Sequence, residues 1–223
     1  KINNLSIISH VFKRAEEANI GEVVVATDDQ KILEDVTKNG GMAILTSTDH
    51  KTGTDRIFEA YKKLDIKNVD YILNLQGDEP DIDKDDIINL NHFMISQNAE
   101  LGTLAAKIKD DKMLNNRNIV KVITEKKLEE SNFPLALNFT RDNLSINNQN
   151  IYHHIGIYSY KASVLKKFVS LDQTNNEKKN KLEQLRALDN KLKINVALAK
   201  TSPIGVDTEE DYLAIKKIME YKI

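Results

Sequence analysis

The loop that reads Gln-Gly-Asp-Glu-Pro at 76–80 carries residue types suited to phosphate chemistry. It follows a short, largely apolar run at 71–75, which has the length of a strand buried in a parallel sheet. Gly77 permits a tight turn, and a carboxylate just beyond a buried strand lies where open α/β sheets bind ligands. Asp78 therefore suits a hard cation such as Mg²⁺, which shares oxygen ligands with phosphate. The alternative is that Asp78 and Glu79 are ordinary turn residues.

A second carboxylate is offered near the end of the chain, in Gly-Val-Asp-Thr-Glu-Glu-Asp at 205–211. Thr208 and Asp211, three residues apart before an apolar helical pattern, resemble a capping box that begins a helix. Helix capping accounts for these two residues and leaves Asp207 without a structural role. We expect Asp207 to complete a Mg²⁺ site together with Asp78.

A polar loop at 46–56 joins hydroxyl groups, Gly53 and Arg56 to the start of a predicted helix. Backbone N–H groups at such a helix start can bind an anion or a nucleotide. Plain helix capping by the hydroxyl groups is the alternative.

The predicted strand at 152–160 contains two adjacent histidines. Strand alternation places His154 and Tyr158 on the same face. His153 and His154 point to opposite faces of a strand, which argues against a shared metal ion. Hydrogen bonding to a polar ligand is the favoured interpretation.

The elements that must position these residues alternate between helical and strand patterns, which is typical of a doubly wound, mostly parallel sheet. The region at about 110–155 is predicted to be an inserted antiparallel segment, in which 119–123 has one solvated face. A helix is predicted at 181–188, and the Asn-rich stretch at 143–150 is predicted to be a mobile loop or a dimer-contacting arm. The expected strands are 22–27, 42–45, 71–75, 101–108, 119–123, 152–160 and 194–199. We interpret 1–223 as a single domain.

Composition narrows the function classes. The 223 residues are 40% hydrophobic, which is enough for a sizeable core. Lys and Arg total 32 against 34 for Asp and Glu, so there is no global field for nucleic acid or an anionic membrane. The chain has no cysteine, which excludes disulfides, zinc thiolates and a cysteine nucleophile. A soluble, intracellular protein is expected.

Five short motifs occur in the same order as in one enzyme family, the 3-deoxy-manno-octulosonate (Kdo) cytidylyltransferases, or CMP-Kdo synthetases. The resemblance covers the chain from Ile7 onward. The motifs are His50-Lys51-Thr52-Gly53-Thr54-Asp55-Arg56, Gln76-Gly77-Asp78-Glu79-Pro80, His154-Ile155-Gly156-Ile157-Tyr158, Leu182-Glu183-Gln184-Leu185-Arg186 and Gly205-Val206-Asp207-Thr208.

The resemblance implies a Rossmann-like nucleotidyltransferase fold of the nucleotide-diphospho-sugar type, acting as a homodimer in a Gram-negative cytoplasm. The implied reaction joins CTP and Kdo to give CMP-Kdo and pyrophosphate for lipopolysaccharide synthesis. By position, Asp78 and Asp207 resemble the Mg²⁺ ligands, and Arg141 would pair with the sugar carboxylate. The nucleotide-binding positions are Gly53, Thr54 and Arg56. The sugar-binding positions are Gln76, Arg141, His154, Tyr158, Glu183 and Gln184.

Three departures from the family pattern leave alternatives open. The family begins with a strand and a phosphate-binding loop that precede the first residue of this chain, so we expect an N-terminally truncated chain. Thr140-Arg141-Asp142-Asn143 stands where the family usually has Ser-Arg-Ala-Pro-Ile-Pro, and Thr52 replaces a serine. The alternatives are a cytidylyltransferase for another keto-sugar acid, such as sialic acid, and a catalytically silent paralogue.

Overall fold

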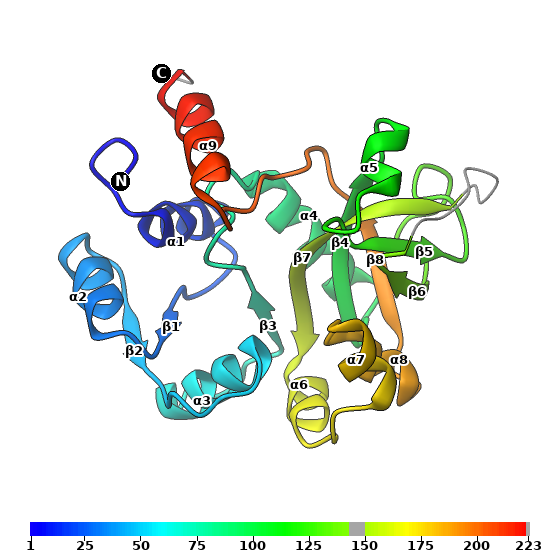
Figure 1. The fold of residues 1–223 in the computed structure, drawn as a ribbon. Helices are drawn as coiled ribbons and strands as arrows, with labels where there is room; N and C mark the ends of the chain where they lie inside the picture. The colour runs from blue at the N-terminus through cyan, green and yellow to red at the C-terminus, as the bar shows by residue number, and fades with distance from the viewer. Residues whose placement is uncertain (143–149, 222–223) are drawn as a thin grey trace. The chain divides into compact units, whose positions relative to one another are not determined.

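A computed structural model describes residues 1–142 and 150–221 (Figure 1). The chain is a mixture of helices and strands, as predicted. The predicted loop at 143–150 lies almost wholly outside the described residues. Within the described ranges, no helix is both long enough and apolar enough to cross a membrane.

The chain divides into two compact units. Unit 1 comprises Lys1–Asn68, Asn74–Ile88 and Pro203–Ile223, and unit 2 comprises Val69–Leu73 and Asn89–Ser202. Each unit is therefore assembled from segments far apart in the sequence. The single domain predicted over 1–223 stays a prediction.

Unit 1 contains a parallel strand pair with helices beside it (Figure 1, blue to cyan, with the final helix in red). The two strands pair with Val25 opposite Ala43 and Thr27 opposite Leu45. Its elements are α1 (Ile7–Ala18), β1 (Val25–Thr27), α2 (Gln30–Lys38), β2 (Ala43–Leu45), α3 (Gly53–Leu64), the first turns of α4 (Lys84–Ser96) and α9 (Glu209–Tyr221).

Unit 2 is built on a sheet with the strand order β6-β5-β7-β4-β8, in which β3 also pairs with β7. The β4–β8 pair is parallel, whereas β5 pairs antiparallel with both β6 and β7, and β7 with β4. The sheet is therefore mixed, and its antiparallel part includes the predicted inserted segment. The elements are β3 (Tyr71–Asn74), β4 (Leu101–Lys107), α5 (Asp111–Asn115), β5 (Lys121–Thr124), β6 (Ala136–Thr140), β7 (Ile151–Lys161), α6 (Ala162–Val169), α7 (Asn175–Asn180), α8 (Gln184–Asp189) and β8 (Ile194–Leu198).

Side-chain caps explain where several helices begin. The Ser6 hydroxyl accepts the Ser9 N–H at 3.2 Å and begins α1. Thr208 and Asp211 form reciprocal bonds before α9, with Thr208 N–H donating to the carboxylate at 2.9 Å. Thr174 begins α7 through a full capping box with Glu177.

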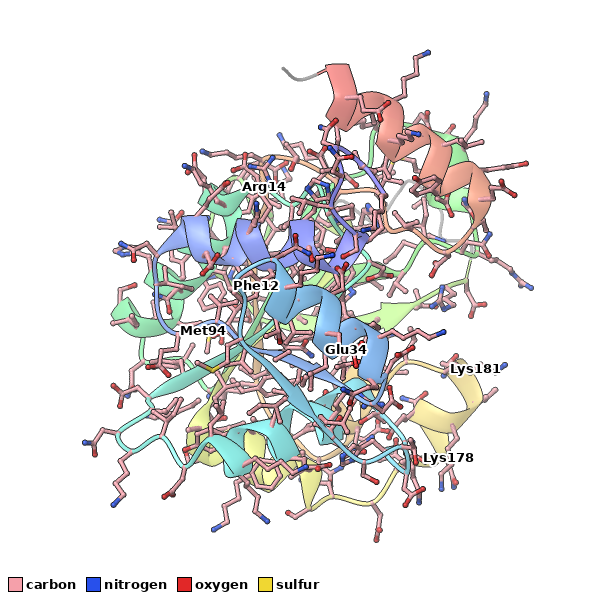
Figure 2. The ribbon with its side chains drawn as sticks, turned by 90° about the vertical axis from the view of Figure 1, so that its left-hand side faces the viewer. Phe12, Arg14, Glu34, Met94, Lys178 and Lys181 are labelled. Carbon is pink, nitrogen blue, oxygen red and sulfur yellow. The ribbon has the colours of Figure 1, made fainter. Side chains whose placement is uncertain are left out.

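The apolar core of unit 1 lies between α1, α2 and the strand pair. Phe12 packs with Val25 and Val36, and Figure 2 shows its ring between α1 and α2. A separate cluster holds α9 in unit 1, where Ile215 and Met219 pack against Ile2. These apolar faces supply the burial that fixes the helices.

In unit 2 the most buried strand is β4, whose first six residues are all buried. Gly102 leaves no room for a side chain, because a Cβ there would lie 2.5 Å from Met94 Sδ and 2.7 Å from Phe133 Cζ. Its bare backbone therefore lets α4 and the 133 segment pack closely against the strand.

Two expectations from the sequence were wrong. The strand at 119–123 was expected to have one solvated face, but Lys121 in β5 is 0% exposed, and its Nζ donates to the carbonyl oxygens of Asn116 and Arg141. The helix predicted at 181–188 begins only at Gln184, since Lys181 adopts a left-handed conformation that ends α7.

We predict that Phe12→Ala lowers the unfolding free energy by about 3–5 kcal/mol, because it removes a buried ring and leaves a cavity. Urea denaturation followed by circular dichroism measures the change. Arg14→Ala is the matched control on the same helix, since the exposed Arg14–Glu17 ion pair is worth at most about 1 kcal/mol. Equal effects of the two substitutions would contradict the proposed position of the core.

Candidate active site

The two carboxylates singled out from the sequence lie in the same unit, and a backbone contact joins their loops. The N–H of Val206 donates to the carbonyl oxygen of Asp78 at 3.0 Å. Gly205 passes beside the same residue, because a Cβ at this position would lie 3.7 Å from Asp78 Oδ2. The segment that carries Asp207 therefore runs directly along the loop that carries Asp78.

The turn before Asp78 depends on a close approach to α1. A Cβ on Gly77 would lie 3.0 Å from Ile8 Cδ1, which is tighter than ordinary van der Waals contact. A larger residue at Gly77 would push the turn away from the helix and move the Asp78 carboxylate with it.

Among the described residues, no basic side chain contributes to the shifted pKa of Asp78. Burial and the negative charge of Asp207 raise the pKa of Asp78, while a backbone hydrogen bond opposes the rise. Asp78, half-buried beside the negative charge of Asp207, therefore suits a divalent cation. In the part of the chain that the structure describes, no cluster of three or more His, Cys, Asp or Glu side chains could hold a metal. The pair alone fits Mg²⁺, which commonly binds one or two carboxylates and completes its shell with water and substrate phosphate.

Arg56, a predicted nucleotide contact, is anchored by residues of unit 1. Its Nη2 donates to Asp28 Oδ2 at 2.8 Å, and its Nη1 donates to Thr46 Oγ1 at 2.6 Å. The guanidinium holds the pKa of Asp28 below its ordinary value. Arg56 thus joins the ends of β1 and β2 to the first turn of α3.

A second group fixes the loop between β2 and α3. The Glu59 carboxylate accepts the Ser47 N–H at 3.0 Å, lies against His50 Nε2 and pairs with Lys63 Nζ at 2.7 Å. These bonds lower the pKa of Glu59 to about 2, and the bond from Lys63 has the largest effect. The loop is therefore fixed by both Arg56 and Glu59.

The other two predicted nucleotide contacts begin α3. Thr52 caps the helix, accepting the Asp55 N–H at 3.3 Å, so the hydroxyl is retained where a serine was expected. Gly53 is exposed, and no described atom lies within 4 Å of the position of a Cβ on it. Thr54 is only 2% exposed, so its side chain faces the protein.

His154 and Tyr158 come together on β7 of unit 2. Their ring centroids are 5.4 Å apart, and Phe139 packs edge-on against the histidine with centroids 5.0 Å apart. Burial lowers the pKa of His154 to about 3, helped by the positive charges of His153 and Arg141. Burial also raises the pKa of Tyr158 well above its ordinary value. Both groups are therefore neutral at physiological pH and can act only as hydrogen-bonding groups.

Arg141 follows β6 in a loop that a buried lysine supports. Its Nη1 donates to the carbonyl oxygen of Asn118 at 2.9 Å. Lys121 Nζ donates to the carbonyl oxygens of Asn116 at 2.7 Å and of Arg141 itself at 3.2 Å. Burial, with the charge of Arg141, lowers the pKa of Lys121. Several positive groups thus gather in this part of unit 2, which suits an anionic ligand group.

Glu183 and Gln184 are placed by a buried ion pair on α7 and α8. Arg186 Nε and Nη2 donate to the two carboxylate oxygens of Glu177 at 2.9 and 2.6 Å, and both residues are at most 4% exposed. The Arg186 guanidinium also lies over the Phe168 ring at 4.7 Å. A bidentate pair of this kind adds geometric specificity as well as interaction energy, so it holds the start of α8 rigidly.

The structure thus groups the predicted site residues in two sets. Unit 1 holds Asp78 with Asp207, Gln76 two residues upstream of Asp78, and the start of α3. Unit 2 holds the other predicted sugar contacts: Arg141, His154, Tyr158, Glu183 and Gln184.

Sequence reasoning missed several supporting residues. Asp28, which follows strand β1 directly, carried the same signal as Asp78 but was assigned only to a helix start. Glu177 could have been found from the Thr-x-x-Glu spacing of its capping box. Lys121 gave no local signal, because its contacts with Asn116 and Arg141 depend on how distant segments pack.

Comparison with known proteins places these features in a family. A family model described as cytidylyltransferase matches residues 1–194. The 3-deoxy-manno-octulosonate cytidylyltransferase of Bartonella bacilliformis is 39% identical over 220 residues, covering 98% of this chain and 90% of the relative. The enzyme of the same description from Thermodesulfovibrio yellowstonii is 41% identical over 228 residues, covering 98% of this chain and 89% of the relative.

Solved structures agree with the predicted fold. A CMP:2-keto-3-deoxy-manno-octonic acid synthetase complexed with CTP superposes with a TM-score of 0.89 at 31% identity, covering all of this chain and 91% of that one. An apo-UDP-glucose pyrophosphorylase reaches a TM-score of 0.70 at 10% identity, covering 97% and 87%, and shows the fold alone. The predicted nucleotide-diphospho-sugar type of fold is confirmed.

We predict that His154 makes the unfolding free energy depend on pH in the acidic range. Its folded pKa of about 3 lies below its ordinary 6.5, so the unfolded state takes up the proton first. Stability present above pH 6.5 is therefore lost as the pH falls toward 3, by about 1 kcal/mol per pH unit within that window.

Urea denaturation of the wild type and His154→Gln at several pH values measures this dependence. As the pH falls, the wild type should lose more unfolding free energy than the variant. A difference that does not vary with pH would show that His154 protonates equally in both states.

Proposed function

Because the chain belongs to the family of 3-deoxy-manno-octulosonate cytidylyltransferases, we propose that it transfers CMP from CTP to the anomeric 2-hydroxyl of Kdo. The products are CMP-Kdo and pyrophosphate. The observation that carries the proposal is the contact between the loops of Asp78 and Asp207. Phosphoryl transfer needs the negative charge on the reacting phosphate to be stabilised, and a cation held by these carboxylates would do so.

The reaction exchanges one phosphorus–oxygen bond for another. The 2-hydroxyl oxygen of the sugar attacks the α-phosphorus of CTP and loses its proton to solvent. The bond from the α-phosphorus to the bridging oxygen breaks, and pyrophosphate leaves with that electron pair. Little covalent chemistry is left to the protein, so positioning and electrostatics supply the rate.

Asp78 and Asp207 are the residues that would hold Mg²⁺. When bound, the cation would neutralise negative charge on the phosphate and lower the pKa of the attacking hydroxyl. The raised pKa of Asp78 supports this role, because a carboxylate beside a like charge gains most from a cation. The backbone bond from Val206 to Asp78 keeps the two loops in register.

The loop before α3 is the proposed nucleotide contact. The exposed Gly53 leaves space for close approach of a ligand to the backbone. Arg56 and Glu59 hold the loop in one conformation, which limits the entropy lost when the nucleotide binds. We therefore propose that the main role of Arg56 is to maintain the conformation of the loop.

The unit 2 residues suit a polyhydroxylated acid. Neutral His154 and Tyr158 offer hydrogen bonds without charge, and Arg141 offers a guanidinium for the carboxylate. Glu183 and Gln184 supply further donors and acceptors in unit 2, and Gln76, which belongs to unit 1, stays a proposed sugar contact.

The same proposal includes a cytoplasmic homodimer that serves lipopolysaccharide synthesis. Strand β6 lies at one end of the sheet order and carries Leu137, whose side chain is 59% exposed. An exposed apolar side chain on an end strand supports a protein contact there. Analytical ultracentrifugation measures the association state.

Pyrophosphate release from CTP and Mg²⁺ tests the function, with Kdo and sialic acid compared as acceptors and the full-length gene product as enzyme. We expect release with Kdo and at least a hundredfold lower kcat/KM with sialic acid, because the named relatives act on Kdo. Preference for sialic acid would support the alternative sugar. A folded protein that releases pyrophosphate with neither acceptor would support the silent paralogue.

Asp78→Asn separates catalysis from stability. We predict that turnover falls roughly a hundredfold or more, because a cation ligand is lost. The unfolding free energy without metal should stay equal or rise, because a half-buried charge beside Asp207 is removed. Turnover and urea denaturation measure both effects.

Glu209→Gln is the matched control for Asp78→Asn, since it removes an exposed negative charge two residues from Asp207 and should leave turnover unchanged. Normal activity of Asp78→Asn would remove the metal assignment. A large loss of stability would show that Asp78 is structural.

A further inference from the structure

A break in strand pairing brings His154 and Tyr158 together. Thr103 of β4 pairs with Tyr158, but the next residue, Leu104, pairs with Ile155. Two residues of β7, Gly156 and Ile157, are thus left over as a bulge. Four residues of regular strand span about 13 Å, yet these two rings lie 5.4 Å apart, so the bulge shortens the distance between them.

The hydroxyl of Thr103 lies inside this bulge and is 0% exposed. Its Oγ1 is 2.6 Å from the carbonyl oxygen of Ile157 and 3.2 Å from that of Ile155. It is also 3.0 Å from Nε2 of His154. Three polar atoms therefore surround one hydroxyl group that has a single hydrogen to donate.

The chemistry of these partners decides where the hydrogens lie. A carbonyl oxygen can only accept, so the Thr103 hydrogen belongs to a carbonyl, and the 2.6 Å contact to Ile157 is the shorter. If the hydroxyl donated to His154 instead, its oxygen would face two buried carbonyl oxygens without a hydrogen between them, at a high cost. The hydrogen between Thr103 and His154 must then come from Nε2.

We propose that Thr103 is a positioning residue that holds His154 as the Nε2–H tautomer and leaves Nδ1 as an acceptor for a hydroxyl group of the sugar substrate. A neutral imidazole has one donor and one acceptor nitrogen, so fixing one fixes the other. Among the described residues, Nδ1 has no hydrogen-bond partner, which leaves it free for a ligand. The low pKa of His154 keeps the ring neutral over the working pH range.

This inference rests on the proposed function for the identity of the ligand, but the tautomer can be tested without it. Nitrogen NMR of protein labelled with ¹⁵N-histidine distinguishes the two tautomers by their shifts. The His154 signals are assigned by their loss in His154→Gln. We expect the Nε2–H pattern in the wild type and in Thr103→Ser, and a loss of that single pattern in Thr103→Val, which keeps the shape but removes the hydroxyl.

Steady-state kinetics supply the second readout. We expect Thr103→Val to raise the KM for Kdo roughly three- to tenfold while the KM for CTP stays unchanged, and Thr103→Ser to restore the wild-type value. The rescue by serine separates a role of the hydroxyl from a role in packing.

Either of two results would overturn the proposal. One is an Nδ1–H pattern for His154 in the wild type, which requires no variant to fold. The other is an unchanged tautomer and an unchanged KM for Kdo in Thr103→Val. If the protein does not use Kdo at all, the NMR result still decides the tautomer, so failure of the function and failure of this inference remain distinct.

Discussion

The proximity of two carboxylates, Asp78 and Asp207, is the constraint on which the rest of unit 1 depends. Asp78 is half-buried, and the charge of the exposed Asp207 helps to raise its pKa, so other forces must hold the two loops together. The backbone bond from Val206 to Asp78 is one of these forces. The apolar side of α9, packed through Ile215 on the N-terminal segment, is the other. Stability elsewhere thus maintains an unfavourable pair that a cation can use.

Unit 2 controls charge in the opposite way. Its His154 and Tyr158 are kept neutral by burial, whereas its buried Arg186 is paired with the Glu177 carboxylate. Neutral donors and acceptors suit the hydroxyl groups of a sugar, and the guanidinium of Arg141 suits its acid group. Under the proposed function, unit 1 would supply the chemistry for phosphate and metal, and unit 2 would supply that for a polar acid.

Local rules single out Asp78 and Asp207 as candidates, and the structure shows that their loops are in contact. Asp78 lies in the turn after β3, and Asp207 remains after the capping of α9 is explained. The same rules could not predict Thr103 or Lys121, because their partners come from strand register and a bulge that no local pattern encodes. The capping box pointed to Glu177 itself, but its partner Arg186 lies nine residues away on another helix, so the buried pair could not be predicted from the spacing.

The most direct test of the central claim is the pKa of Asp78, measured by carboxyl ¹³C NMR with and without Mg²⁺ and assigned with Asp78→Asn. We predict a value above the ordinary 3.8 without Mg²⁺, a lower value in Asp207→Asn and a marked fall when Mg²⁺ saturates the site. A pKa that lies at its ordinary value and responds to neither Asp207 nor Mg²⁺ would contradict the account.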